Sequence, residues 1–278
     1  MVKNNYDPKV IDDFGNEWKS YDQSSVDIEE LKKQFSNYFR IFQWQDRITS
    51  GIGADFGCGT GRWAKFVADR ADRLICLDAS YNAVRVAKRN LFDKNKCCII
   101  HGRIDALPIK DNSLDFAYSL GVLHHLPDTG DAIKECAKKL KSGAPFLVYL
   151  YYAFDNRPYW YLLVWKLSDV IRKIISIAPF KIKYFLCNII SIIIYFPLAR
   201  LSFLLEKLGI NVQNIPLSEY RKKSFYTMRT DSLDRFGTKL EQRFTKKQIK
   251  KMMSDAGLGN IHFSNIAPYW CVIGYKNC

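Results

Sequence analysis

The sequence predicts an α/β fold in which a mostly parallel sheet is covered by helices on both faces. From residue 51 onward, short apolar segments alternate with amphipathic segments at the spacing of strand–helix units. Residues 144–152 are apolar almost throughout, as expected for a strand that is covered on both faces of a parallel sheet. A chain of 278 residues can form one such domain with an elaboration.

The first 50 residues are polar and aromatic, and we expect them to form a helical cap. A helix is predicted from about Ser25, because Asp27 suits its first turn and apolar residues recur at helical spacing up to Phe39. Trp18, which precedes this helix, either packs on the domain or forms a lid over a ligand.

The strands and helices of the core follow in regular order. The predicted strands are residues 53–56, 74–78, 97–100, 114–120 and 144–152, and the predicted helices are 62–70, 80–92 and 131–140. This alternation implies right-handed crossover connections. Later in the chain, Thr245 can cap a helix over 246–256 that ends at Gly257, and residues 261–264 and 270–275 are predicted as two more strands.

Residues 153 to about 210 interrupt this pattern with apolar runs that are separated by lysine and arginine. The longest run, between Lys183 and Arg200, has 16 residues. A spanning helix needs roughly 20 apolar residues, so we do not expect one here. Two interpretations remain open: a helical insert that packs on the core, or a basic, apolar surface that lies on a membrane or binds a lipid-like acceptor.

These observations predict three regions. The first is an N-terminal cap at residues 1–50, and the second is a core formed by residues 51–152 and 240–278. The third, residues 153–239, is an apolar and basic helical insert with a segment on the acceptor side. Peripheral membrane contact through residues 158–205 is one interpretation of this insert.

Composition and charge narrow the classes of partner and compartment. The formal charge of +14 suggests an anionic partner, such as nucleic acid, an acidic membrane or a phosphorylated substrate, or else a generally basic surface. The eight cysteines contain no CxxC pair and no zinc-like spacing, so we expect no metal site and reduced, buried thiols. Without an apolar signal region near residue 1, a cytoplasmic protein is expected.

The strongest motif is residues 55–61, which read Asp-Phe-Gly-Cys-Gly-Thr-Gly between the first strand and the first helix. Glycines in such a turn let a ligand approach the backbone closely. The dinucleotide fingerprint GxGxxG would need glycine at the position of Arg62. The turn therefore favours a nucleoside ligand without a pyrophosphate, and Asp55 suits an ammonium or sulfonium charge on that ligand.

Three further segments point to the same kind of ligand. Asp78 ends the second strand, where its carboxylate can accept hydrogen bonds from both ribose hydroxyls or can cap the next helix. Asp105 is placed to accept from an adenine amino group while Ala106 donates its N–H, although a simple turn acid is the alternative. Residues 114–126 form an apolar strand that carries a polar loop to the carboxyl edge of the sheet.

In this order and spacing, the four segments resemble the class I methyltransferase superfamily, in particular its type 11 methyltransferase domain, over about residues 45–152. The resemblance implies a Rossmann-like sheet of seven strands with an antiparallel last strand, and S-adenosylmethionine as the cofactor. The glycines would flank its methionine part. The residues that the resemblance and the motifs together assign to the cofactor are Asp55, Gly57, Cys58, Gly59, Gly61, Asp78, Ala79, Asp105, Ala106, Ser119 and Leu120.

The expected reaction is methyl transfer by in-line displacement to a small-molecule or lipid-linked acceptor, with donor and acceptor aligned at about 3 Å. A general base helps most with a hydroxyl acceptor. His124 and His125 are the candidates, with packing as the alternative role. Tyr151, Tyr226 and Arg229 are candidates for acceptor contact, with a core aromatic role or a surface salt-bridge cluster as the alternative.

Two other classes of function stay open. The basic charge permits an RNA or other nucleic-acid methyltransferase, but the chain has neither an Asn-Pro-Pro-Tyr motif nor a separate RNA-binding module, so nucleic acid is not the expected partner. A non-catalytic cofactor-binding protein is the other alternative. The sequence leaves open whether oxygen, nitrogen or carbon receives the methyl group.

Overall fold

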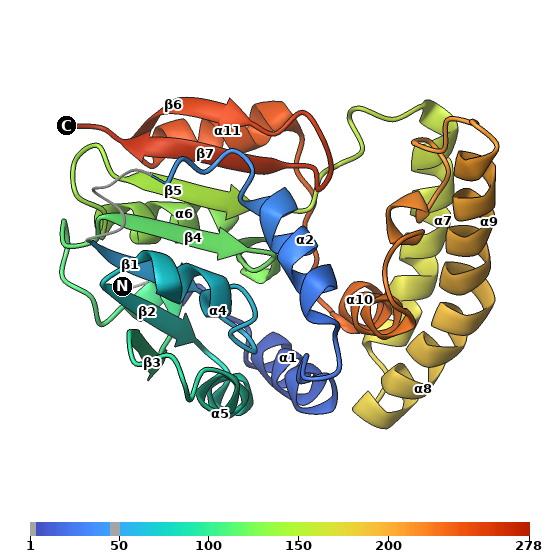
Figure 1. Ribbon diagram of the computed structural model, residues 1–278, viewed down its shortest axis with the longest axis horizontal. Coiled ribbons are helices and arrows are strands. Elements are labelled where there is room, and N and C mark those ends of the chain that lie inside the picture. The colour runs from blue at the N-terminus through green and yellow to red at the C-terminus, as the bar shows by residue number, and fades with distance from the viewer. Residues whose placement is uncertain (1–3, 45–50) are drawn as a thin grey trace. The chain divides into compact units, whose positions relative to one another are not determined.

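The computed structural model describes residues 4–44 and 51–278 and contains a seven-stranded sheet in the order β3-β2-β1-β4-β5-β7-β6 (Figure 1). Strands β1 to β5 pair in parallel, and β7 is antiparallel to both β5 and β6. The predicted Rossmann-like sheet with its antiparallel last strand is therefore confirmed. The strands are β1 (Ile52–Phe56), β2 (Arg73–Asp78), β3 (Cys97–His101), β4 (Phe116–Leu120), β5 (Pro145–Tyr149), β6 (Leu258–Phe263) and β7 (Cys271–Lys276).

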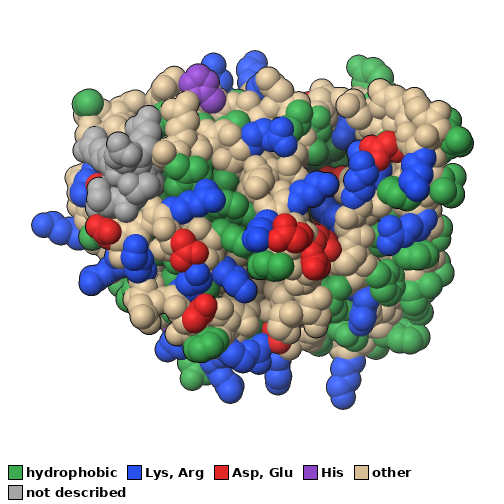
Figure 2. Space-filling view, viewed as in Figure 1, with side chains coloured by type: hydrophobic (Ala, Val, Ile, Leu, Met, Phe, Trp, Pro, Cys, Tyr) green, Lys and Arg blue, Asp and Glu red, His purple; other side chains and the backbone are tan. Residues whose placement is uncertain are grey.

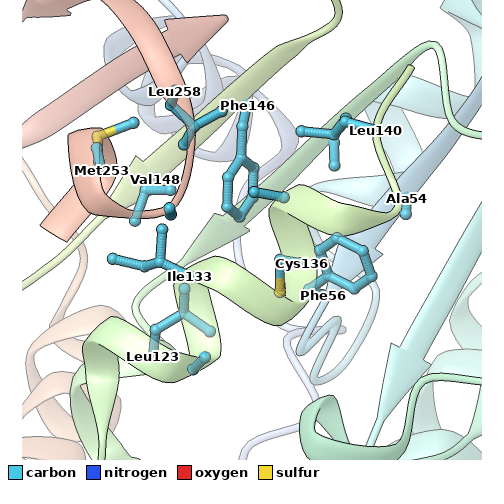
Figure 3. Close-up of a cluster of buried hydrophobic side chains, with 14 of the residues drawn as sticks. Ala54, Phe56, Leu123, Ile133, Cys136, Leu140, Phe146, Val148, Met253 and Leu258 are labelled. Atoms are coloured by element: carbon cyan, nitrogen blue, oxygen red, sulfur yellow. The ribbon is translucent and has the colours of Figure 1, made fainter. Parts of the chain in front are cut away.

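Both faces of this sheet are buried by helices. On one face, Phe56 and Phe146 pack against Ile133 of α6 and Met253 of α11, as Figure 3 shows. The other face carries a second buried cluster that includes residues of α2, α4 and α5. These helices are α2 (Ile28–Tyr38), α4 (Ala64–Val67), α5 (Tyr81–Asn90), α6 (Thr129–Lys138) and α11 (Lys246–Asp255).

Side-chain caps decide where several helices begin. The Asp27 carboxylate accepts from the N–H groups of Glu29 and Glu30, so α2 begins at Ile28 rather than at the predicted Ser25. Asp128 likewise caps α6, which therefore begins before the predicted residue 131. The helix predicted over residues 62–70 is the shorter α4 followed by a 3-10 turn, η1 (Ala68–Arg70).

The chain divides into two compact units. The first unit comprises Met1–Ser24, Leu31–Ala153 and Gln242–Cys278 and contains the sheet. The second comprises Ser25–Glu30 and Phe154–Glu241. Its helices are α7 (Tyr159–Ser176), α8 (Phe180–Ile190), the π-helical segment η4 (Ser191–Tyr195), α9 (Phe196–Lys207) and α10 (Phe225–Gly237).

In the second unit, the prediction that the apolar run is too short to span a membrane is wrong in its estimate of length. Helices α8 and α9 join through η4 into one helix, Phe180–Lys207, of 28 residues. By length and composition alone this helix could cross a membrane. The 16-residue run is thus only part of the helix, because the helix includes the charged residues Lys183 and Arg200 that bound the run. Pro197 does not interrupt it, since this residue lies in the first turn of α9.

The eight cysteines are all free, but they are not all buried as expected. Cys98 is exposed on β3, a strand at the edge of the sheet, and Cys278 is exposed at the end of the chain. Cys97 is half-buried. Cys98 is exposed because successive side chains of a strand point to opposite faces, and β3 has a neighbouring strand on one side only.

We expect Thr245→Ala to lower the free energy of unfolding by about 1 kcal/mol. Thr245 and Gln248 form a reciprocal capping box at the start of α11, and this box satisfies backbone N–H groups that the helix leaves unpaired. Urea denaturation followed by circular dichroism would measure the change. Thr245→Ser is the matched control, because it keeps the hydroxyl. Equal loss in both variants would contradict the capping explanation.

Candidate active site

The glycine turn after β1 is held against the end of β2 by backbone hydrogen bonds. The N–H groups of Gly57 and Cys58 donate to the Leu77 carbonyl at 2.8 and 3.0 Å. Gly57, Gly59 and Gly61 all have positive φ (82°, 53° and 78°), a region that residues with a Cβ rarely adopt. The glycine pattern is therefore required by the backbone path of this turn.

Asp78 joins this turn to the start of α5. One carboxylate oxygen accepts from the Gly59 N–H at 2.9 Å and the other accepts from the Ser80 N–H at 2.8 Å. Burial raises the pKa of Asp78, and these two backbone bonds oppose the rise. The side chain that caps α5 is Ser80, not Asp78. Each oxygen of Asp78 thus keeps acceptor capacity for a ligand at the carboxyl edge of the sheet.

The same turn contains a buried hydroxyl group that has no hydrogen-bond partner among the described residues. Thr60 is 1% exposed, and its Oγ1 is unpaired. A buried unpaired hydroxyl is unfavourable unless a ligand or water supplies the missing bond. With Asp78 beside it, the turn offers the polar groups that a nucleoside ligand needs.

Asp55, at the end of β1, is buried and accepts a hydrogen bond from the Tyr118 hydroxyl at 3.0 Å. Burial, together with the neighbouring Asp78 carboxylate, raises the pKa of Asp55 to about 8, although the Tyr118 bond acts in the opposite direction. The carboxyl group is therefore largely protonated near neutral pH. A cationic ligand group beside it would favour the ionised form.

The N-terminal segment engages Asp105. Asn5 donates its backbone N–H to Asp105 at 3.2 Å, and Arg103 Nε donates to the same carboxylate at 3.0 Å. Asn5 also exchanges hydrogen bonds with the backbone of Asp128. The N–H of Ala106, expected to face a ligand, donates instead to the Arg103 carbonyl at 3.2 Å in a 3-10 turn, η2 (Ile104–Ala106).

Helix α1 (Pro8–Ser20) lies over the glycine turn. A Cβ on Gly15 would meet Ser80 Oγ at 2.4 Å, so glycine permits α1 to approach the start of α5. A Cβ on Gly59 would lie 3.3 Å from the Trp18 ring, which places this indole directly on the turn. Arg62 lies over the same indole, 5.8 Å from its centroid. Trp18 therefore covers the turn, consistent with both roles considered for it.

The remaining residues assigned to the cofactor line the ends of β1, β2 and β4. The Ser119 hydroxyl donates to the Phe56 carbonyl at 2.7 Å and so ties β4 to β1. Leu120 and Cys58 are buried in the second apolar cluster. The carbonyl of Ala79 lies 2.9 Å from a ring nitrogen of His101.

The predicted base candidates are brought together with Tyr151. His124 and His125 lie in the 3-10 turn η3 (Leu123–His125) after β4, and the His124 ring is 3.9 Å from that of Tyr151. His124 is fully buried, and neither ring nitrogen has a hydrogen-bond partner among the described residues. Burial lowers the pKa of His124 well below its usual range, and His125 and Arg243 add to this effect. The imidazole is therefore neutral, and its surroundings oppose protonation.

The structure adds residues to this group that the sequence analysis missed. Arg243 lies over Tyr151, 5.1 Å from the ring centroid, and Phe14 of α1 packs on His125 at 4.8 Å. Gln242 donates its N–H to the His124 carbonyl at 3.1 Å. These residues are more than a hundred positions from the histidines, and no local motif marks them.

Tyr226 and Arg229, predicted to contact the acceptor, belong to α10 of the second unit. Arg229 Nε donates to Asn188, and its Nη2 donates to the Tyr184 hydroxyl at 3.1 Å. Arg229 thus links α10 to α8. Tyr226 is half-buried in the first turn of α10. Over residues 4–44 and 51–278, no three His, Cys, Asp or Glu side chains lie close enough together to hold a metal ion.

Comparison with known proteins agrees with this geometry. Residues 54–148, from β1 to β5, match the family model described as "Methyltransferase domain". A protein of Mycolicibacterium smegmatis, named as an S-adenosylmethionine-dependent methyltransferase, is 38% identical over 33% of this chain and 35% of its own. A demethylmenaquinone methyltransferase of Bacillus licheniformis is 30% identical over 47% of this chain and 57% of its own. The chain thus spans about a third to just over half the length of these two relatives.

A solved structure extends the likeness of fold to almost the whole chain. A chain from the complex between the Haloferax volcanii Trm112 methyltransferase activator and a methyltransferase superposes with a TM-score of 0.55. It is 14% identical, and the match covers 95% of this chain and 98% of that one. Residues 54–148 therefore match a methyltransferase domain, and the solved structure adds a likeness of fold alone.

We expect the stability of the protein to fall, relative to Asp55→Asn, as pH rises from about 4 to about 8. The folded state holds the pKa of Asp55 at about 8 against an ordinary value of 3.8. Over this interval the unfolded chain loses the Asp55 proton while the folded chain keeps it, so rising pH favours unfolding. Asparagine imitates the neutral carboxyl group. Thermal unfolding at several pH values would measure the difference, and parallel curves for the two proteins would contradict it.

Proposed function

We propose that the protein transfers a methyl group from S-adenosylmethionine to a small-molecule or lipid-linked acceptor. The observation that supports this most strongly is the Asp78 carboxylate, which is fixed by the Gly59 and Ser80 N–H groups beside the glycine turn. Class I domains of the kind that this sequence resembles use S-adenosylmethionine, and the family model matches residues 54–148 of the chain. The activity of the whole chain is therefore our proposal.

The described residues fit this cofactor. Asp78 has acceptor capacity for the ribose hydroxyls, and the unpaired Thr60 hydroxyl adds a polar group in the turn. Asp105, which already accepts from Asn5 and Arg103, would hold the adenine amino group. The turn glycines let the methionine part approach the backbone, and Asp55 would face its positive charge.

When bound, the cofactor supplies a methyl group that is already activated by a sulfonium. The residues of this chain then have to hold an acceptor in line with the methyl carbon and keep water away. Trp18 and Phe14 of α1 cover the glycine turn and His125 with apolar rings. This cover would keep water away from the methyl group during the transfer.

We propose His124 as the group that takes a proton from the acceptor, with His125 and Tyr151 positioning it. The neutral His124 ring, with both nitrogens unpaired, has the acceptor capacity that a hydroxyl or amine acceptor requires. A proton on the ring would be disfavoured by burial and by Arg243.

The second unit supports an apolar or lipid-linked acceptor. Its helices expose many apolar side chains and carry lysines. One relative is named as a demethylmenaquinone methyltransferase. Peripheral membrane contact through residues 158–205 belongs to the same proposal, and Tyr226 and Arg229 remain candidates on the acceptor side.

We expect S-adenosylhomocysteine to bind the protein and NAD not to bind, because Arg62 occupies the position where the dinucleotide fingerprint needs glycine. Asp78→Ala should weaken S-adenosylhomocysteine binding by about 1–3 kcal/mol, because ribose hydroxyls would lose a buried acceptor. Isothermal titration calorimetry measures both effects. Asp72→Ala, an exposed acid of the same unit, is the matched control. Unaltered affinity in Asp78→Ala would contradict the assignment.

Incubation with methyl-labelled S-adenosylmethionine should label quinone precursors, lipid-linked sugars or polyketides and leave RNA unlabelled. The reason is the exposed apolar character of the second unit, which suits apolar acceptors better than a phosphate backbone does. Chromatography of the labelled products gives the readout. Label only in RNA would favour the nucleic-acid alternative. No transfer to any acceptor by a protein that binds the cofactor would favour the non-catalytic one.

A further inference from the structure

The second unit concentrates exposed apolar surface on its helices. All but five of the large hydrophobic side chains that are exposed among the described residues lie between residues 159 and 210. The other five are scattered singly, which is normal for a folded protein. Figure 2 shows hydrophobic side chains gathered along the margin that carries α9, with Lys and Arg beside them. A concentration of this kind marks an interaction surface.

On α7 the exposed apolar side chains form one continuous stripe. Their spacing of three or four residues places them on a single face of the helix. Leu167, in the middle of this stripe, is 69% exposed. The members are Trp160, Leu163, Val164, Leu167, Val170, Ile171, Ile174 and Ile177.

The helix formed by α8, η4 and α9 carries a second stripe along its whole length. A π-helical turn contains more residues than an α-helical turn. Apolar residues spaced three and four apart, as in an α-helix, would therefore drift to another face of the helix within η4. The spacing instead becomes four from residue 189 to 201, which keeps one face apolar. The exposed positions that follow this spacing are Ile182, Phe185, Ile193, Pro197, Leu201, Leu204 and Leu208.

The opposite face of the same helix is fixed to α10. The Cys187 carbonyl accepts from the hydroxyls of Ser191 and Ser232, at 2.8 and 3.0 Å, and Arg229 of α10 donates to Asn188. These bonds lie on a buried stripe that also includes Ile190 and Tyr195. Because α10 carries charged residues along this contact, the helix would have to abandon it to cross a bilayer alone. The geometry favours a helix that lies in the plane of a surface.

The exposed charged side chains beside the apolar stripes are all positive. Between residues 159 and 207, the exposed charged side chains are Lys166, Lys173, Lys181 and Lys207. The two acids in this range, Asp169 and Glu206, are only partly exposed and pair with arginine and lysine. An anionic surface complements these lysines. A second copy of the same face would bring them against their equivalents.

We propose that the apolar face of α7, α8, η4 and α9 docks in the plane of an anionic phospholipid bilayer. The stripes would enter the boundary between headgroups and acyl chains, and the lysines would contact the anionic headgroups. Trp160, at the start of α7, has the amphipathic ring that is enriched at such an interface. This inference deepens the membrane part of the proposed function, and it does not depend on methyl transfer.

Flotation with vesicles tests the proposal. The full chain should float with vesicles of phosphatidylglycerol and phosphatidylcholine. Leu167→Asp combined with Ile174→Asp should lower binding by about tenfold or more, because each aspartate replaces an apolar side chain that enters the lipid. Phe92→Asp combined with Ile266→Asp is the matched control, because it adds the same charge at exposed apolar sites of the other unit and should float normally.

The charge contribution needs its own variant. Lys166→Gln combined with Lys181→Gln should weaken binding to the anionic vesicles by about fivefold for each lysine. Lys247→Gln combined with Lys250→Gln, two exposed lysines of α11, should have little effect. Equal loss from both pairs would mean that net charge alone drives binding and would overturn the assignment of the face.

Three other results would overturn the inference. The first is absence of vesicle binding by the unaltered protein. The second is a dimer in sedimentation that Leu167→Asp disrupts. The third is retention on vesicles after a carbonate wash, which would indicate a spanning helix. Calorimetry with S-adenosylhomocysteine keeps the two proposals apart, because every surface variant should bind the ligand normally. Circular dichroism confirms that each variant is folded.

Discussion

The bond between the Gly59 N–H and the Asp78 carboxylate is the constraint on which the site depends. It joins the turn after β1 to the end of β2, two elements that lie side by side because their strands pair in parallel. The second oxygen of Asp78 accepts from Ser80 and so fixes the start of α5. One carboxylate thus holds three segments at the carboxyl edge of the sheet, where open α/β folds bind their ligands.

The parts of the site that are local in sequence could be predicted, and the parts that form through long-range contacts could not. Asp78 and the turn glycines stand at fixed distances from strand ends, so strand prediction was sufficient to place them. Asn5 meets Asp105, and Arg243 meets Tyr151, only because the chain folds back over the sheet. The Thr60 hydroxyl is informative only once its burial is known.

The helices of the second unit could also be predicted only in part. Apolar runs predicted helices there, but the count of 16 residues between Lys183 and Arg200 did not reveal one helix of 28 residues. The difference arises because the helix continues through Lys183 at one end and Arg200 at the other, while the π-helical segment keeps it continuous before Pro197. Secondary structure of this kind has no reliable signal in the sequence. The consequence for function is a single apolar face that extends along the whole helix.

The central claim is that the turn after β1 holds a methyl-donating nucleoside. A crystal structure of the protein with S-adenosylhomocysteine would test it most directly. The account predicts density for the ligand over Gly57–Gly61, with the ribose hydroxyls on Asp78 and the adenine beside Asp105. Density at any other place, or a turn that stays empty at saturating ligand, would contradict it.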